Sequence, residues 1–146
     1  MTPDVNLLVA AFRQGHVHHA SARRWLGGAL AECARGETSL GLLPVAIVSF
    51  LRLVTNSRVF ADPDTIADGV AFVDAMLASP GVALLGGAEW PLLRQKLLTL
   101  DLSGNEITDA WIAALTEAHG ESLVTYDRDF RRLLAPRDLT LLQPPS

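Results

Sequence analysis

Acidic residues whose types and spacing could do chemistry together follow two predicted strands. Asp4 comes directly after a short N-terminal strand, and Asp127 comes directly after the strand predicted over Glu121–Tyr126. Asp129 is two residues beyond Asp127, so its side chain points to the same side if the chain stays extended. Because ligands of open α/β sheets bind beyond the carboxyl ends of the strands, we expect these carboxylates to face one crevice.

A predicted helix brings two more acids to this crevice. Asp109 lies one turn inside the helix expected to begin near Ser103, and Glu106, three residues before it, shares its face. Converging carboxylates repel one another and raise one another's pKa values, a conflict that a divalent cation removes. Oxygen ligands without Cys or a necessary His point to Mg²⁺ or Mn²⁺ rather than to zinc. Such an ion activates water and neutralises charge on a phosphodiester.

Each acid also has a structural interpretation. Asp129 could be the N-cap of a short helix over Phe130–Leu134. The segment Ser103–Glu106 matches a capping box, which would give Glu106 a structural role. Asp109 could be an ordinary exposed helix acid and Asp4 a turn residue. The joint placement of the acids, more than any single one, therefore indicates the metal site.

The elements that must position these acids alternate between strand-like and helix-like patterns, which predicts an α/β domain with a mainly parallel sheet. About five strands are expected, one ending near Asp4 and the others over 38–43, 82–85, 121–126 and 139–142. Helices are expected over 6–12, 18–35, 44–55, 64–79, 89–100, 107–119 and 130–134. Two apolar stripes at helical spacing support the second and fourth of them: Ala22, Trp25, Leu26, Ala29 and Leu30, then Ile66, Val70, Val73 and Leu77.

The composition is that of one globular domain spanning residues 1–146, with 49% hydrophobic and 19% charged residues. A net charge of −4 lacks the basic footprint of many nucleic-acid binders, although all but one of the 12 cationic residues are Arg, which suits phosphate contacts. The single Cys33 excludes an internal disulfide and a Cys-based metal site. No apolar run is long enough to span a membrane and no signal peptide is evident, so we expect a cytoplasmic protein.

Four segments resemble the motifs of PIN-domain nucleases. Asp4-Val5-Asn6-Leu7-Leu8 resembles their opening Asp-x-Asn motif, and Thr108–Ala114 resembles their Asp-Ala-x-x-Ala-Ala helix. Leu123–Phe130 resembles their Thr-x-Asp-x-Asp-Phe motif. Phe50–Asn56, followed by Arg58-Val59-Phe60, is similar to a signature of the VapC-like toxin branch abundant in mycobacteria. The matches occur in order and span nearly the whole chain.

The resemblance implies a three-layer α/β/α fold and a Mg²⁺-dependent endoribonuclease toxin, usually dimeric and restrained by a small antitoxin. Its metal ligands would be Asp4, Asp109 and Asp127, with Asp129 assisting directly or through water. Asn6 belongs to the first motif, and Thr125 would support the ligands by hydrogen bonding. Water would attack phosphorus in line, the 3′-oxygen would leave, and no covalent enzyme intermediate would form. Transfer RNA or ribosomal RNA would be the substrate.

One departure from the family pattern concerns the third helix, where many PIN domains carry a Glu. Pro44–Asn56 contains no acid, and Ser49 falls roughly where that Glu would be. The site is then one carboxylate short, which would weaken metal binding or leave more positions to water, unless Glu106 compensates. Two alternatives therefore stay open: a weak or inactive PIN-fold binding protein, and a nuclease acting on structured DNA.

The remaining polar residues and the tryptophans have weaker functional interpretations. The histidines at 16, 18 and 19, with Arg13, Arg23 and Arg24, form either an RNA-contacting rim or a solvated helix start. Arg131 or Arg132 could anchor a substrate phosphate or simply lie on a surface helix. Arg52 needs an anionic partner if buried, so a structural ion pair is the expected role. Trp25, Trp90 and Trp111 are expected in the core or a dimer interface.

Overall fold

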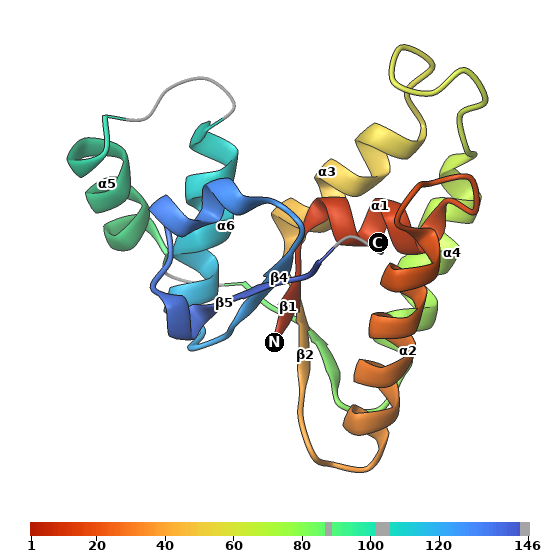
Figure 1. The fold of residues 1–146 in the computed structure, drawn as a ribbon, viewed down its shortest axis with the longest axis horizontal. Helices are drawn as coiled ribbons and strands as arrows, with labels where there is room; N and C mark the ends of the chain where they lie inside the picture. Colours follow the sequence, from red (N-terminus) through yellow and green to blue (C-terminus); the bar gives the residue numbers. More distant parts are fainter. Residues whose placement is uncertain (87–88, 102–105, 144–146) are drawn as a thin grey trace.

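The strands of the computed structural model are short and parallel, and they lie where the sequence placed them (Figure 1). The structure describes residues 1–86, 89–101 and 106–143. The strands are β1 Thr2–Pro3, β2 Leu40–Leu42, β3 Val82–Leu84, β4 Leu123–Thr125 and β5 Leu139–Leu141. The helices are α1 Val5–Phe12, α2 His19–Ala34, α3 Pro44–Val54, α4 Ile66–Leu77, α5 Trp90–Thr99 and α6 Glu106–Ala118, with 3₁₀ turns η1 Arg128–Arg132 and η2 Pro136–Asp138.

The strands are hydrogen-bonded in two groups, β1-β4-β5 and β2-β3, and every pair is parallel. The amide of Gly41 in β2 donates to the carbonyl of Met1 at 2.8 Å, which joins the groups in the order β3-β2-β1-β4-β5. Thr2 lies opposite Leu123, and the amide of Asp4 donates to Val124 at 3.0 Å. The carboxyl ends of β1 and β4, which lie far apart in sequence, therefore meet.

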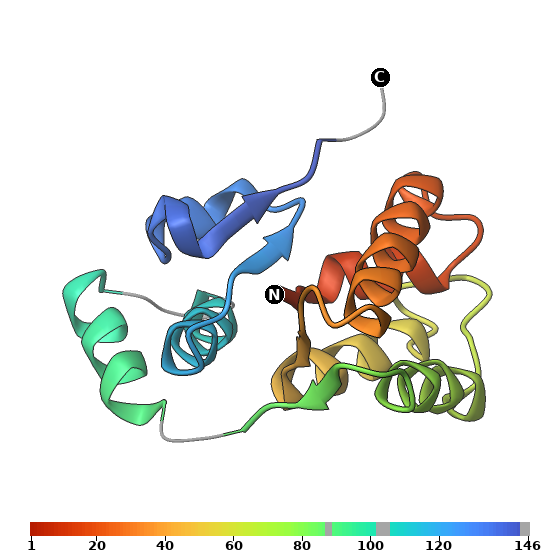
Figure 2. The same cartoon turned by 90° about the horizontal axis from the view of Figure 1, so that it is seen from below.

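Helices cover both faces of this sheet, so the predicted three-layer α/β fold with about five strands is confirmed. Helices α1 and α2 pack together on one side, and α5 and α6 pack together on the other (Figure 2). Helix α3 contacts both α1 and α6, so it closes the edge where the two layers approach each other. Phe50 of α3 and Phe130 of η1 are the largest fully buried side chains of the core. None of the described helices is long and apolar enough to cross a membrane.

The apolar stripe predicted for α2 is correct, whereas the one predicted for α4 is rotated. In α2 the buried residues are Ala22, Leu26, Ala29 and Cys33. In α4 they are Gly69, Val73 and Met76, while Ile66 is 57% and Val70 is 40% exposed. Gly69 causes the rotation, because a Cβ there would stand 2.8 Å from Leu51 Cδ2, so α4 presents its bare backbone to α3.

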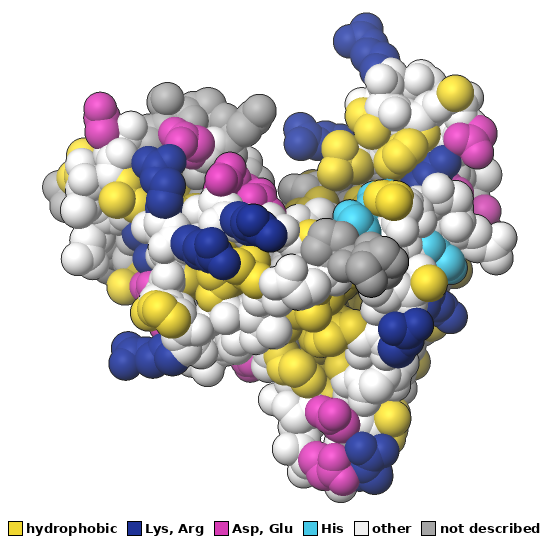
Figure 3. Space-filling model, viewed as in Figure 1, with side chains coloured by type: hydrophobic (Ala, Val, Ile, Leu, Met, Phe, Trp, Pro, Cys, Tyr) yellow, Lys and Arg dark blue, Asp and Glu magenta, His cyan; other side chains and the backbone are white. Residues whose placement is uncertain are grey.

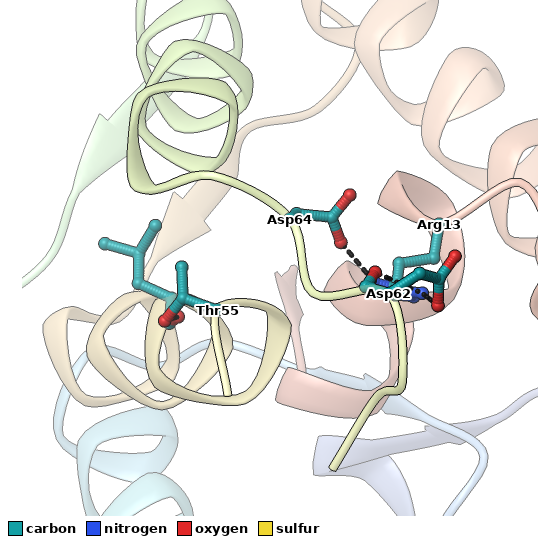
Figure 4. A network of polar contacts seen from close by, with 5 residues as sticks. Arg13, Thr55, Asp62 and Asp64 are labelled. Carbon is teal, nitrogen blue, oxygen red and sulfur yellow. Dashed lines mark hydrogen bonds and ion pairs between the residues drawn. The ribbon is translucent and has the colours of Figure 1, made fainter. Parts of the chain in front are cut away.

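The connection between α3 and α4 is fastened to α1 by Arg13 (Figure 4). Its guanidinium donates to Asp62 Oδ1 at 2.8 Å, forms an ion pair with Asp64 and lies 3.8 Å above the ring centroid of Phe60. The Arg13 side chain is only 12% exposed. It therefore belongs to this network and is unavailable to the RNA-contacting rim considered from the sequence.

Candidate active site

Asp4 stands at the joint between β1 and α1, where two donors hold both of its carboxylate oxygens. It is the N-cap of α1, so Oδ1 accepts from the amide of Val5 at 2.6 Å. Oδ2 accepts from the hydroxyl of Thr125 at 2.7 Å. The residue is 4% exposed. Its orientation is therefore fixed by the local helix start and by the end of β4 together.

Thr125 is the centre of the polar contacts at this joint. Its hydroxyl carries one proton, which the short contact assigns to Asp4. Its oxygen accepts from Asn6 Nδ2 and from the amide of Asp127, both at 3.0 Å. The side chain is fully buried. Thr125 thus donates to Asp4, one of the metal ligands that the resemblance implied, and the contact between Asn6 and Thr125 ties α1 to the end of β4.

Asp127 and Asp129 have different positions, because the chain does not stay extended between them, which was the condition for both side chains to point to one side. Asp127 is partly buried and is the N-cap of η1, with Oδ1 accepting from the amide of Asp129 at 2.8 Å. Asp129 is exposed in the first turn. The interpretation of Asp129 as an N-cap, one of the two considered from the sequence, is therefore wrong, because the chain tightens into a 3₁₀ turn at Arg128 instead of beginning a helix at Phe130.

A cavity of about 350 Å³ collects the three main acids from separate parts of the chain. Its lining residues come from the start of α1, the middle of α3, the first turns of α6 and the end of β4; they are Asp4, Val5, Asn6, Ser49, Arg52, Leu53, Thr108, Asp109, Ile112 and Asp127. Figure 3 shows this region as the notch between the α3 lobe and the α6 lobe. The predicted joint placement of Asp4, Asp109 and Asp127 is what the fold produces.

Asp109 also borders a second, smaller depression of about 40 Å³, which it shares with Glu106, Asp129, Arg132 and Leu133. Glu106 Oε1 accepts from Arg132 at 3.2 Å across the exposed rim of this depression. Glu106 is the first residue of α6, whereas Ser103, the other end of the proposed capping box, lies outside the described residues. Asp109 therefore stands between the main cavity and the outer acids.

Two acids of the cavity, Asp4 and Asp109, hold their protons more tightly than usual because their pKa values are raised. Burial is the main reason that the pKa of Asp4 rises from 3.8 to about 6, against the lowering effect of the Thr125 and Val5 donors; Asp109 and Asp127 raise it further. Burial also raises the pKa of Asp109 to about 6, assisted by the charges of Asp127, Asp129 and Glu106. Mutual repulsion is thus present, as the sequence predicted.

The donor set fits a hard divalent cation in chemistry. Carboxylate oxygens in a cavity where they repel one another are the ligands that Mg²⁺ or Mn²⁺ prefers. Over residues 1–86, 89–101 and 106–143, no three carboxylate, imidazole or thiol groups already stand together as a metal cluster. The acids therefore line one cavity but are not yet close enough together to coordinate one ion, so binding an ion would require them to move closer.

Other residues singled out in the sequence lie away from the cavity. The ring of His18 stacks on Tyr126 with centroids 4.6 Å apart, and the Tyr126 hydroxyl meets Ser21 Oγ at 2.5 Å. This contact fastens the start of α2 to the residue before Asp127. Arg131 lines a separate hollow beside β5. Trp25 packs against the core, and the side chain of Trp90 is outside the described part of the structure.

Arg52 is the site residue that the sequence analysis misjudged. It is exposed and lines the acid cavity, and no hydrogen bond or ion pair joins it to another described residue. The expected structural ion pair is therefore absent from the described part of the chain. The available signal was its spacing of three residues from Ser49, which places both on one face of α3.

Comparison with known proteins gives a consistent result. A family model described as PIN domain matches residues 1–134. Ribonuclease VapC43 of Mycobacterium tuberculosis is 37% identical over 131 residues, covering 88% of this chain and 86% of that relative. Ribonuclease VapC25 of the same species is 36% identical over 144 residues, covering 97% of this chain and 96% of that relative.

Solved structures resemble the whole chain in fold. VapBC2 from Rickettsia felis, bound to a DNA fragment from its promoter, has a TM-score of 0.66 at 16% identity and covers 97% of this chain and 98% of its own. M. tuberculosis VapC20, described as a Sarcin-Ricin loop cleaving toxin, has a TM-score of 0.57 at 17% identity and covers 89% of this chain and 92% of its own.

Proposed function

Because the chain belongs to the PIN domain family, with VapC ribonucleases among its relatives, we propose that it is a single-domain Mg²⁺-dependent endoribonuclease. The resemblance drawn from the motifs is thereby confirmed as to family. One observation carries the proposed activity: Asp4, Asp109 and Asp127, from three distant segments, line one cavity. The raised pKa values of Asp4 and Asp109 support the same assignment, because a bound cation would offset both the burial of these carboxylates and the repulsion from neighbouring acids.

In this proposal Asp4, Asp109 and Asp127 hold the ion, and Asp129 acts from the outer depression through water. When bound, Mg²⁺ supplies activation of water and neutralises charge on the scissile phosphodiester. Thr125 keeps a carboxylate oxygen of Asp4 oriented, and Asn6 keeps Thr125 oriented in turn. Ser49 faces the cavity where a family acid often stands, so this chain leaves more of the coordination to water than a four-acid site does.

Partners and substrate follow from the relatives. A VapBC complex among the structural neighbours supports a small antitoxin as the restraining partner, and relatives named as ribonucleases support RNA as the substrate. A homodimer in the cytoplasm is part of the proposal because the motif resemblance implies a usually dimeric toxin. VapC20 is described as cleaving the Sarcin-Ricin loop, which favours a structured ribosomal or transfer RNA as the substrate here.

The proposal is tested by RNA cleavage with Mg²⁺, with EDTA and with Asp4→Asn. We expect cleavage of total RNA by the wild type with Mg²⁺, and a loss of at least about 100-fold with EDTA or the variant, typical of removing a stabilising group at a reacting centre. Asp74→Asn, which changes an exposed acid on α4, is the matched control and should leave cleavage unchanged.

Two alternatives have their own outcomes in this assay. The absence of an acid on α3 favours a PIN-fold binding protein without activity, and no cleavage by the wild type under any metal would establish it. Cleavage of a matched structured DNA in preference to RNA would establish a DNA nuclease. Equal cleavage by wild type and Asp4→Asn would remove the assignment of the active site.

A further inference from the structure

Next to the acid cavity lies a second concavity of about 290 Å³ between α3 and α6. Its lining is mostly apolar and consists of Pro44, Val45, Val48, Ser49, Arg52, Thr108 and Trp111. Three of these residues, Ser49, Arg52 and Thr108, also line the acid cavity, so the two spaces are continuous. We call this concavity the Trp111 groove. A ligand that extends from the acid cavity into the Trp111 groove therefore passes these three polar residues and then contacts an apolar surface.

The apolar part of the Trp111 groove is unusually open to solvent. Val48 is 65% exposed and Trp111 is 40% exposed, although both are large hydrophobic residues. The indole Nε1 of Trp111 donates to Glu89 Oε1 at 3.0 Å, which holds the ring in place while it lines the groove. An oriented and accessible aromatic ring of this kind is what a stacking partner requires.

The charges where the Trp111 groove meets the acid cavity indicate which class of ligand the groove binds. The acid cavity repels a phosphate group, yet Arg52 stands at its edge with no partner among the described residues. A free guanidinium binds phosphate oxygens in bidentate fashion. A ligand that presents a phosphate beside a flat, mostly apolar ring would use Arg52 and Trp111 together. A nucleotide of single-stranded RNA has this chemistry.

We propose that the Trp111 groove binds the nucleobase adjacent to the cleaved bond, with Arg52 on the phosphate between groove and acid cavity. This inference rests on the proposed nuclease function and deepens it. The volume of about 290 Å³ is at the small end of ligand pockets, which run from about 300 to 1,000 Å³, and so suits one base rather than a longer stack. Arg52 is then a positioning residue for substrate, and specificity at one flanking nucleotide resides in the groove.

The first test is binding without cleavage. The indole N–H signal of Trp111 in the full chain, assigned by its loss in Trp111→Phe, is followed in EDTA while a mixed-sequence single-stranded RNA dodecamer is added. We expect this signal to shift with the RNA and to stay unchanged with inorganic phosphate. An unchanged signal with RNA overturns the proposal, and so does dissociation of an oligomer by Trp111→Ala, because a second copy of the chain would then cover the groove.

The second test uses the cleavage kinetics on an RNA whose cut site has been mapped. Trp111→Ala should lower kcat/KM roughly 5- to 100-fold, mainly through KM, as expected for the loss of one base–aromatic stack. Arg52→Gln should also raise KM, whereas Arg137→Gln, at a side chain 87% exposed near β5, is the matched control. Leu98→Ala, at a residue 66% exposed on α5, controls for loss of an exposed apolar side chain.

An abasic nucleotide in the RNA substrate tests whether Trp111 contacts the base of one particular nucleotide. On the side of the cleaved bond whose base occupies the groove, the abasic nucleotide should lower the cleavage rate of the wild type about as much as Trp111→Ala does. It should not lower the cleavage rate of Trp111→Ala any further. Additive effects at both flanking positions overturn the proposal. Cleavage by the wild type with no effect of Trp111→Ala rejects the groove and keeps the nuclease, whereas absence of cleavage with a shifted indole signal rejects the nuclease and keeps the groove.

Discussion

At the scale of single residues, the site depends on a small number of hydrogen-bond donors that orient its oxygen atoms. The hydroxyl proton of Thr125 goes to Asp4, while the same oxygen accepts from Asn6 and from the amide of Asp127. The side chain of Thr125 thus orients both the Asp4 carboxylate and the segment that carries Asp127. The amide of Val5 holds the other oxygen of Asp4 at 2.6 Å, so loss of the Thr125 hydroxyl would release one of the two carboxylate oxygens.

Replacing Thr125 with Val keeps the shape of the side chain and removes its hydrogen bonds. We expect the free energy of unfolding to fall by about 1–3 kcal/mol, because buried polar groups lose their partner, and cleavage to fall because Asp4 is no longer oriented. Urea unfolding and RNA cleavage measure the two effects. Thr125→Ser should retain both properties, and Thr140→Val, at an exposed position of β5, is the matched control. A Thr125→Val protein as stable and active as the wild type contradicts this role.

The acids of the site could be predicted from sequence because local position determines each of them. Asp4 and Asp127 follow strands and Asp109 lies in the first turns of a helix, so the parallel topology alone brings them together. The cap at Asp127 and the exposure of Arg52 could not be predicted. The first depends on a 3₁₀ turn that begins two residues earlier than the expected helix, and the second on the separation between α3 and α6.

At the scale of elements, glycines decide how closely neighbouring segments approach. A Cβ on Gly41 of β2 would lie 2.2 Å from Leu85 Cδ1, so the residue after β3 occupies the space of a side chain. Gly69 plays a similar part between α4 and α3, and this is why the buried face of α4 is rotated from the predicted apolar stripe. A hydrophobic pattern in the sequence gives a glycine no preference for the buried or the exposed face, whereas in the folded protein a neighbouring element can pack directly against the glycine backbone. The strand and helix bounds, which depend on local pattern, were predicted within a few residues.

Two glycine substitutions should therefore have opposite effects. Gly41→Ala should lower the free energy of unfolding by about 1–3 kcal/mol through overpacking against Leu85. Gly28→Ala, on the exposed face of α2 with nothing within 4 Å of the added Cβ, should raise it by up to about 1 kcal/mol through helix propensity. Chemical denaturation of both variants measures the difference. A stabilising Gly41→Ala would show that Leu85 moves aside without cost.

At the scale of the whole molecule, the electrostatics of the cavity couple folding to protons. Asp4 and Asp109 have a pKa of about 6 in the folded protein against 3.8 for an ordinary Asp. The folded chain therefore binds more protons than the unfolded chain between these values. The stabilising contribution of each group is complete below about pH 3.8 and is lost as the pH rises through about 6. The cavity thus opposes folding at neutral pH unless its charge is compensated.

Thermal unfolding in EDTA tests this coupling. We expect the contribution of Asp4 to appear as a fall in melting temperature from about pH 4 to about pH 7 that is smaller in Asp4→Asn. Asp74→Asn should keep the wild-type slope. Added Mg²⁺ should raise the melting temperature of the wild type above about pH 6 and have little effect near pH 4, where protons occupy the carboxylates. An identical pH slope for Asp4→Asn and wild type contradicts the assignment of the raised pKa.

The contact between Asp4 and Thr125 joins residues 121 positions apart. Loop closure over such a distance carries an entropic cost that only the later packing of β4 against β1 offsets. A fragment ending before residue 123 keeps Asp4 and Asp109 but has no Asp127, and no hydroxyl to orient Asp4. The order of biosynthesis thus keeps the growing chain without a complete site until β4 has been made and paired, whereas α1 to α4 and their apolar contacts are synthesised much earlier.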